Sequence, residues 1–270
     1  MKRRSLLLVL TLCAMLSALM TLSQPVLAQG KPGIERMYVL YCGDIALNDA
    51  SSFTPGASGP GHLSVTCYLI KHARGWVLFD TGVGDHIVSM PNGQKSQAGV
   101  WTVKKTLESQ LSEIGLKPAD INYLILSHLH GDHVGNLKLF PQSTLVVQKA
   151  EWEWKPPVGP VISQSGMKAL TPDGDHDLFG DGSVVCLPTH GHTPGHQSLR
   201  VRLDSGDVVL TSDACYLRRT IEHDHLPPQP FDRDAMLDSL RRLRALGAGG
   251  ARLVFGHDAE NWAGMPAELA

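Results

Sequence analysis

The sequence has no excess of basic residues, since 24 lysines and arginines stand against 26 aspartates and glutamates in 270 residues. A nucleic-acid partner would require a basic face for its phosphates, so this class of partner is not expected. The chain also has no low-complexity tract, no internal repeat of fixed period and no linker-like segment. These absences argue against a repeat architecture and predict one α/β domain, for which the apolar content of 43% supplies a full core.

Cysteine is also scarce. Five are present, and no two of them have the C-x-x-C spacing of a thiolate zinc site. Cys13 lies in the N-terminal segment. The other four, Cys42, Cys67, Cys186 and Cys215, lie in or beside apolar, strand-like stretches, which is typical of buried small side chains. An oxidising compartment would permit a disulfide, and Cys42 and Cys67 are the pair to examine for one.

The N-terminus combines positive charge with a long apolar run. Basic residues at positions 2–4 precede an uncharged apolar stretch over residues 6–22, and the small residues Val26 and Ala28 follow. This order predicts a secretory signal peptide over residues 1–28, with an uncleaved membrane anchor as the alternative. Cleavage would leave 21 basic and 26 acidic residues, a net charge of −5, in a domain over residues 29–270. The expected location is the periplasm or the cell exterior, with no stable membrane association after cleavage.

Apolar periodicity predicts strands and helices along the whole remaining length. Strands are expected over residues 36–41, 65–70, 76–79, 121–126, 144–148, 183–187, 198–203, 208–211 and 252–255. Helices are expected over residues 103–114 and 234–246. A loop rich in serine, glycine and proline spans residues 47–61, and long loops in compact domains often act as lids.

Three imidazoles and a carboxylate fall within six residues in the run SHLHGDH over residues 127–133, directly after an expected strand. Buried imidazoles need partners, and divalent metals bind imidazole and carboxylate, so this density is typical of metal ligands. Residues two apart in an extended chain project to the same side, so His128 and His130 can bind one ion together. The glycine that follows permits a turn, after which Asp132 and His133 can face a second position nearby.

Three further segments bring histidine or aspartate to the end of an expected strand, and they contain His192 and His196, Asp213, and His257. Five histidines and two aspartates in these segments are taken as candidate ligands. Seven ligands are too many for one tetrahedral ion and fit a dinuclear site with a bridging carboxylate. We therefore expect two divalent ions per chain. Zinc is favoured, and Co²⁺, Mn²⁺ or Fe²⁺ would suit the same ligand types.

These ordered motifs resemble those of the metallo-β-lactamase superfamily and, within it, of the N-acyl-homoserine lactonases. The matching segments are MYVL over residues 37–40, FDTG over 79–82, HLHGDH over 128–133, HTPGHQSL over 192–199, TSDACY over 211–216 and FGHD over 255–258. They span nearly all of the chain that follows the N-terminal segment. The resemblance implies a four-layer αβ/βα sandwich, two mixed β-sheets flanked by helices, with the site at one edge of the packed sheets.

The resemblance also implies a role for each ligand. One ion would take His128, His130 and His192, the other Asp132, His133 and His257, and Asp213 would bridge them. The implied reaction is the opening of the lactone ring of N-acyl-homoserine lactones, the signals of bacterial quorum sensing, by a hydroxide that bridges the two ions. Asp132 would also carry a proton to the leaving alkoxide, and Tyr216 would stabilise the oxyanion.

Other histidines and aspartates receive different expectations. Asp80 and His196 are expected to orient ligands without binding the ions. Asp258 is expected to be structural. His190, His223 and His225 match no motif position and are expected at the surface or rim.

Alternative activities share the core motif. Hydrolysis of β-lactams or thioesters is the main alternative, although a bridging Asp213 counts against β-lactamases. Glyoxalase II has similar ligands and a C-terminal helical region, which the thirteen residues after His257 lead us not to expect here. An iron-dependent sulfur dioxygenase and a non-catalytic metal-binding protein are less favoured.

Gly131 departs from the lactonase pattern, in which a bulkier residue is common. We therefore expect a wider pocket at this point or an acyl chain held differently. Substrate contacts would then come from the loop over residues 47–61, including Phe53, and from residues 223–231. The sequence leaves open whether the chain forms a homodimer.

Overall fold

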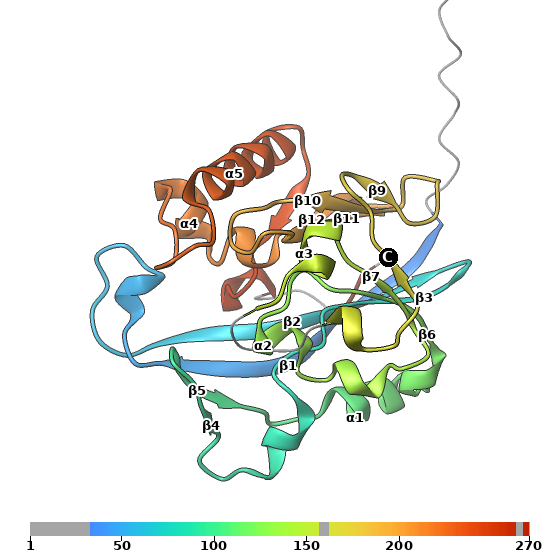
Figure 1. Cartoon of the computed structure of the whole chain (residues 1–270), viewed down its shortest axis with the longest axis horizontal. Coiled ribbons are helices and arrows are strands. Elements are labelled where there is room, and N and C mark those ends of the chain that lie inside the picture. The colour runs from blue at the N-terminus through green and yellow to red at the C-terminus, as the bar shows by residue number, and fades with distance from the viewer. Residues whose placement is uncertain (1–32, 157–161, 263–266, 270) are drawn as a thin grey trace, which may run out of the picture. The chain divides into compact units, whose positions relative to one another are not determined.

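The computed structural model describes residues 33–156, 162–262 and 267–269, so the signal peptide predicted over residues 1–28 lies outside the described residues. Among the residues that are described, no helix is long and apolar enough to cross a membrane. Two β-sheets pack face to face between two layers of helices (Figure 1).

The larger sheet is mixed and has the strand order β4-β5-β1-β2-β3-β6-β7-β8, with β14 beside β1. Its strands are β1 (Ile34–Leu47), β2 (Gly61–His72), β3 (Gly75–Phe79), β4 (Gln94–Lys95), β5 (Gly99–Thr102), β6 (Ile121–Ile125), β7 (Thr144–Val146), β8 (Ala169–Leu170) and β14 (Glu268–Leu269). Neighbours are antiparallel from β4 to β3 and parallel from β3 to β8. Strands β1 and β2 extend well beyond the predicted 36–41 and 65–70, because they pair with each other along their full length.

The smaller sheet has the order β13-β12-β11-β10-β9. Its strands are β9 (His176–Asp177), β10 (Val184–Pro188), β11 (Gln197–Leu203), β12 (Gly206–Leu210) and β13 (Arg252–Val254). It is mixed as well, since β12 and β13 are parallel and the other neighbours are antiparallel. The four strands predicted in this half of the chain are confirmed to within two residues at either end.

The α-helices are α1 (Leu107–Glu113), α2 (Gly131–Val134), α3 (Lys149–Glu153), α4 (Arg218–His223) and α5 (Arg233–Ala248). Short 3-10 helices are η1 (Ala50–Ser52), η2 (Asp85–Ser89), η3 (Pro118–Asp120), η4 (Leu137–Leu139), η5 (Ile162–Gln164), η6 (Ser212–Ala214) and η7 (Ala259–Trp262). Helix α5 confirms the helix predicted over residues 234–246. Helix α1 begins at Leu107 rather than at residue 103, because the Thr106 side chain accepts a hydrogen bond from the Ser109 N–H and caps the helix there.

Side chains alternate between two faces in both sheets, as expected for strands. In β10, Cys186 lies in the cluster between the sheets, whereas Val185 and Leu187 pack in the cluster that contains residues of α5. In β2, Ile70 lies between the sheets and Leu69 packs in the cluster that contains residues of α1. The layers are therefore helix, sheet, sheet and helix, which confirms the predicted αβ/βα sandwich.

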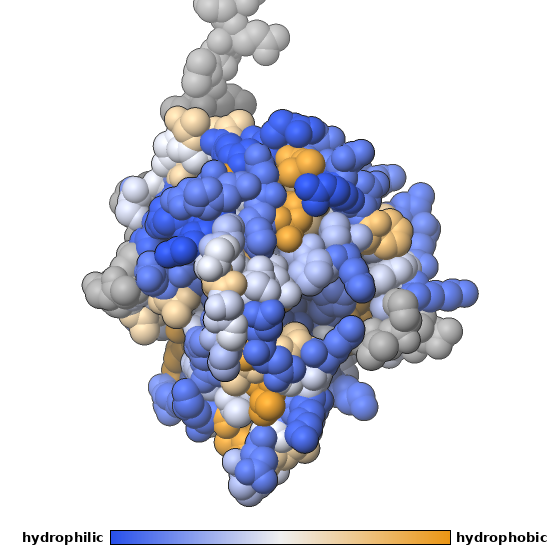
Figure 2. Space-filling model, turned by 90° about the vertical axis from the view of Figure 1, so that its left-hand side faces the viewer, coloured by the Kyte–Doolittle hydropathy of each residue, from blue (hydrophilic) through white to orange (hydrophobic). Residues whose placement is uncertain are grey.

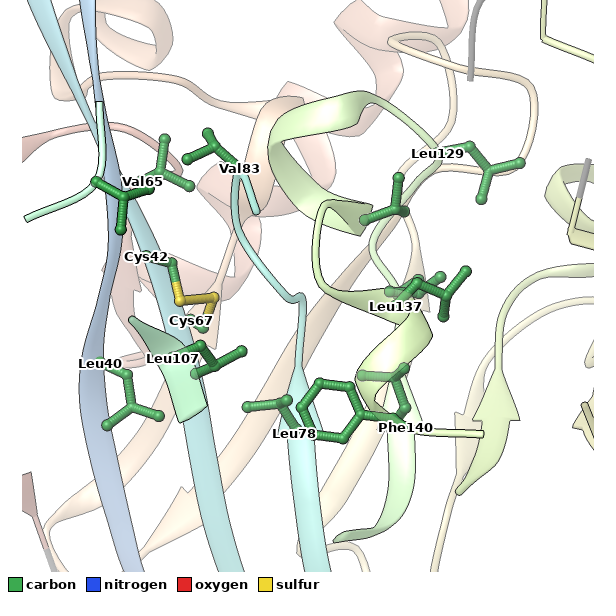
Figure 3. Close-up of a cluster of buried hydrophobic side chains, with 14 of the residues drawn as sticks. Leu40, Cys42, Val65, Cys67, Leu78, Val83, Leu107, Leu129, Leu137 and Phe140 are labelled. Carbon is green, nitrogen blue, oxygen red and sulfur yellow. A yellow bond between two sulfur atoms is a disulfide. The ribbon is translucent and has the colours of Figure 1, made fainter. Parts of the chain in front are cut away.

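A disulfide joins Cys42 and Cys67, with 5.9 Å between their Cα atoms, and confirms the pair selected from the sequence. It lies in the apolar cluster on the α1 side of the larger sheet (Figure 3). Cys42 sits at a register shift of β1, between Tyr41 and Gly43. The Gln110 amide of α1 accepts a bond from the Tyr41 N–H (3.0 Å) and donates one to its carbonyl (2.6 Å). The disulfide thus closes β1 onto β2 where the regular pairing is interrupted.

Replacing both Cys42 and Cys67 with alanine is expected to lower the free energy of unfolding by about 3 kcal/mol. The disulfide spans 25 residues, and removing it frees that loop in the unfolded chain. Denaturant unfolding of the variant and of the reduced wild-type protein should give similar midpoints, both below that of the oxidised protein. Equal midpoints for the oxidised and the reduced wild-type protein would contradict this expectation.

Candidate metal centre

The ligand-type residues lie just beyond the carboxyl ends of four strands. Strands β6, β10, β12 and β13 lead respectively to residues 128–133, His192, Asp213 and His257. In the smaller sheet β10, β12 and β13 point the same way, because β11 is antiparallel to its two neighbours and β12 is parallel to β13. The Gln197 N–H donates to the Ser127 carbonyl at 2.9 Å, which joins the edge of the smaller sheet to the loop after β6. The fold thus gathers segments that are far apart in sequence at one edge.

Three imidazole nitrogens converge in what we call the first ligand group, which consists of His128, His130 and His192; Asp213 lies close to all three. The His128 Nε2 lies 3.0 Å from the His130 Nδ1 and 3.2 Å from the His192 Nε2, and the last two atoms are 2.9 Å apart. Ligand atoms around a tetrahedral zinc would be about 3.3 Å apart, given metal–nitrogen bonds of about 2.0 Å. The three nitrogens are therefore spaced much as one ion requires.

Asp132, His133 and His257 form a second ligand group. The Asp132 Oδ2 is 3.6 Å from the His133 Nε2 and 3.7 Å from the His257 Nε2. Both histidine rings are buried, and the Asp132 side chain is 13% exposed.

Asp213 lies between the two groups and directs one carboxylate oxygen to each. Its Oδ1 is 3.1 Å from the His133 Nε2 and 3.0 Å from the His257 Nε2. Its Oδ2 is 3.4 Å from the His192 Nε2 and 3.8 Å from the His128 Nε2. This is the arrangement that a carboxylate bridging two ions would need.

The polar atoms of the two ligand groups are arranged for binding metal ions rather than for hydrogen bonding to one another. Among the described residues, the His133 Nε2, the His257 Nε2 and the Asp213 Oδ1 are buried and have no hydrogen-bond partner of adequate geometry. Buried polar atoms are normally paired, and unpaired ones are costly. Nitrogen and oxygen donors that converge in this way match the ligand types of zinc and similar divalent ions. The residues present therefore fit two metal ions.

The two groups differ in their electrostatics. Burial holds the pKa of His128 and His192 well below the usual value and lowers that of His130. Burial also acts to lower the pKa of His133 and His257, but the charges of Asp213 and Asp132 outweigh it and raise both. Burial alone would raise the pKa of Asp213, yet His257 and His133 hold it well below its usual range. The imidazoles of the first group are therefore neutral, whereas His133 and His257 of the second group interact electrostatically with the Asp213 carboxylate.

Hydrogen bonds on the far side of the rings orient the ligands, as is usual around metal sites. Asp80 accepts from the Ser127 N–H (2.7 Å), and its Oδ2 lies 2.8 Å from the His133 Nδ1. The His257 Nδ1–H donates to the Ser64 carbonyl at 2.9 Å, which leaves the Nε2 facing Asp213. The orienting position expected for Asp80 matches this geometry.

The remaining histidines and Asp258 lie outside both groups. His196 is buried, its Nδ1–H donates to the Thr189 carbonyl at 3.0 Å, and burial lowers its pKa to about 3. Its ring centroid lies 5.2 Å from that of His128. Asp258 accepts from the Arg218 N–H at 3.0 Å, where α4 begins, in agreement with a structural role. Of the three histidines expected at the surface or rim, His223 is exposed and His190 and His225 are half-buried.

Tyr216 lies against the metal centre. Its hydroxyl is 3.5 Å from the His192 Nε2, and its ring centroid is 5.1 Å from that of His257. Burial, and after it the charge of Asp213, raise the pKa of Tyr216 well above the usual value, so the phenol keeps its proton at neutral pH. Phe53, from the loop expected to act as a lid, packs on the Tyr216 ring with 5.0 Å between centroids.

A cavity of about 380 Å³ opens beside Phe53. It is lined by Asn48, Asp49, Ser52, Phe53, Gln97, Ala98, Pro228 and Gln229, so the two segments predicted to contact substrate both contribute. Phe231 is 61% exposed and its ring lies near that of Trp154, which in turn lies 6.3 Å from the His130 ring. The side of the molecule with the loop between β1 and β2 is largely hydrophilic, and its apolar residues form separate patches (Figure 2).

The space expected beside Gly131 is occupied by another residue. A Cβ placed on Gly131 would lie 2.8 Å from the Trp101 Cη2 and 3.2 Å from its Cζ3. Trp101 belongs to β5, which pairs with β1 near one end of the larger sheet, and its ring lies against Gly131. The absence of a side chain at residue 131 therefore makes room for the indole and does not leave a wider pocket at this point.

Glu151 of α3 is a buried residue near the site that no sequence motif indicated. Burial raises its pKa to about 7, against the effect of three hydrogen bonds that it accepts from Leu129, Thr193 and Gly195. These partners are 22, 42 and 44 residues away in sequence, so no local pattern could have connected them with it.

Comparison with known proteins agrees with this geometry. The family model of the metallo-beta-lactamase superfamily matches residues 60–257. The N-acyl homoserine lactonase AttM of Azorhizobium caulinodans is 32% identical to this chain over 253 residues, which cover 84% of the chain and 94% of the relative. The N-acyl homoserine lactonase AiiA of Bacillus thuringiensis subsp. kurstaki is 32% identical over 244 residues, with the same two coverages.

A solved structure of an N-acyl homoserine lactone hydrolase, with the product N-hexanoyl-L-homoserine bound at its catalytic metal centre, superposes with a TM-score of 0.75. It is 28% identical in sequence, and the match covers 86% of this chain and 97% of that one. The chain therefore belongs to the metallo-beta-lactamase superfamily and, within it, to the family of the N-acyl homoserine lactonases.

Proposed function

We propose that this protein opens the lactone ring of N-acyl-homoserine lactones with two divalent metal ions. The ions would be held by His128, His130 and His192 on one side, by Asp132, His133 and His257 on the other, and by Asp213 between them. The observation that carries the proposal is the position of Asp213, whose two oxygens face the two ligand groups separately. The named relatives supply the substrate class, since both are N-acyl homoserine lactonases.

Bound ions would lower the pKa of a coordinated water and polarise the lactone carbonyl, so that attack proceeds near neutral pH. Tyr216 keeps its phenol proton and donates it as a hydrogen bond to the carbonyl oxygen as negative charge develops there. Asp132 is less buried than Asp213; it would accept the proton that the attacking water oxygen releases and pass it to the alkoxide oxygen that leaves as the ring opens. Phe53 and the polar cavity beside it contact the acyl-amide part of the substrate.

We propose zinc as the native ion, because the first ligand group consists of three imidazoles. Elemental analysis of protein purified without added metal tests this choice. Iron as the main metal would contradict it and would direct attention to oxidative chemistry.

We propose that the chain is exported, with residues 1–28 removed. The basic and apolar N-terminal pattern supports this, and so does the disulfide between Cys42 and Cys67, which persists in oxidising compartments. Mass spectrometry of the mature protein from cell fractions should find it outside the cytoplasm and beginning at residue 29. A cytoplasmic protein that retains its first residues would contradict export.

A panel of substrates tests the proposed reaction. The purified protein is given N-hexanoyl- and N-decanoyl-homoserine lactone, a β-lactam and a thioester, and acid release is followed in a pH-stat. An oxygen electrode with a persulfide tests the dioxygenase alternative. We expect the lactones to be opened with the highest kcat/KM, and a higher value for the β-lactam or the thioester would overturn the substrate assignment.

A further inference from the structure

One fully buried carboxylate touches both loops that supply the first ligand group. Glu151 accepts hydrogen bonds from the Leu129 N–H (2.9 Å), the Thr193 hydroxyl (2.8 Å) and the Gly195 N–H (2.9 Å). Leu129 stands between His128 and His130 in the chain, and Thr193 directly follows His192. The carboxylate therefore connects the segments that present all three imidazoles.

The contact is close on the backbone as well. A Cβ placed on Gly195 would lie 2.1 Å from the Glu151 backbone nitrogen, so only glycine allows this loop to lie directly on α3. The loop ends are joined separately, since Gln197 donates to the Leu126 carbonyl at 2.8 Å. The Gln197 bond joins the two loops at the ends of their strands, whereas Glu151 joins them beside the ligand histidines.

A side chain with two acceptor oxygens suits these three donors. Two backbone N–H groups and one hydroxyl all point at Glu151, and a carboxylate can accept from each of them. An amide offers only one acceptor oxygen and would turn its own donors toward a backbone N–H. Burying a carboxyl group is costly, so an apolar residue would suit position 151 better if the side chain served only for packing.

We propose that Glu151 is a positioning residue of the metal centre, which holds the loops of His128, His130 and His192 so that their nitrogens converge on one ion. This inference rests on the proposed metal centre and does not depend on which substrate is hydrolysed. Groups that orient metal ligands from behind commonly change metal affinity by about 10- to 100-fold when they are replaced. Because Glu151 contacts the loops of the first ligand group, the loss is confined to one of the two ions.

The test compares Glu151→Gln with Glu153→Gln, a matched change at an exposed residue of the same helix. Zinc affinities are measured by competition with a chromophoric chelator, and the cobalt-substituted proteins give the absorption of each site. We expect Glu151→Gln to lower the affinity for one zinc ion by about 10- to 100-fold. The affinity for the other ion and the circular dichroism spectrum should be unchanged, and Glu153→Gln should bind both ions as the wild-type protein does. Thr193→Val removes one of the three donors at nearly constant shape, and it should weaken the same ion by a smaller factor.

The proposal is overturned if Glu151→Gln binds both ions as the wild-type protein does, or loses both equally. If Glu151→Gln does not fold, Thr193→Val decides alone, and unchanged affinities then reject the proposal. These measurements use no substrate. A protein that binds ions in the expected pattern but opens no lactone would retain the role of Glu151 and refute the proposed function.

Discussion

Replacing Asp213 with alanine is expected to reduce kcat/KM for lactone opening by about 10²- to 10⁴-fold, together with loss of bound metal. The variant leaves His133 and His257 without the carboxylate that lies 3.0–3.1 Å from their Nε2 atoms. Removing one partner of a buried charge pair leaves the other uncompensated, which costs about 3–5 kcal/mol of stability, and the rate falls because the ions that activate water are no longer held. The same change removes the group that faces both ligand groups, so we expect both ions to be weakened.

Asp204→Ala provides the matched control, because Asp204 lies exposed in the turn between β11 and β12. Metal content by elemental analysis and initial rates in a pH-stat are measured on both variants. Asp213→Asn keeps the shape of the side chain while removing its charge, and it should also lose metal. An Asp213→Ala protein that holds two ions and retains wild-type rates would refute the bridging position.

Replacing Tyr216 with phenylalanine is expected to lower kcat by about 10²- to 10³-fold while both ions stay bound. Removal of one hydrogen-bond donor to a developing oxyanion has an effect of this size. The phenol is available as a donor because burial and Asp213 raise its pKa well above the usual value. Phenylalanine keeps the ring that packs on Phe53 and His257, so folding should be little changed.

The Tyr216→Phe experiment separates catalysis from packing. If the tyrosine only fills space, kcat and KM will both remain near the wild-type values. If the hydroxyl binds the substrate equally in the ground state and the transition state, KM will rise and kcat will stay constant. The expected result is a fall in kcat with metal content and thermal midpoint unchanged.

The clustering of the candidate ligands could be predicted because they follow apolar strands, four of them at short spacings within one run. His128, His130, Asp132 and His133 occupy one run, and the structure places them with His192, Asp213 and His257 at one edge of the sheets. The layers were implied by the resemblance of the motifs to the metallo-β-lactamase superfamily, and the division of β2 and β10 side chains between the clusters agrees with them.

The features that were missed depend on contacts between distant segments. Glu151 lies in a charged segment between Lys149 and Glu153 that matches no motif, and its three partners lie at least 22 residues away. Trp101 stands on a short strand and meets Gly131 only because β5 adds to the edge beside β1. Strands of two to four residues such as β4, β5 and β8 carry too few residues to show a period, and pairing with their neighbours defines them.

Metal reconstitution tests the central claim most directly. The protein is stripped of metal with a chelator, zinc is added back in steps, and bound ions and hydrolysis of N-hexanoyl-homoserine lactone are measured on the same samples. We expect activity to vanish on stripping and to return fully at about two ions per chain. Lactone opening that survives complete removal of metal, or a fully loaded protein that opens no lactone, would contradict the account.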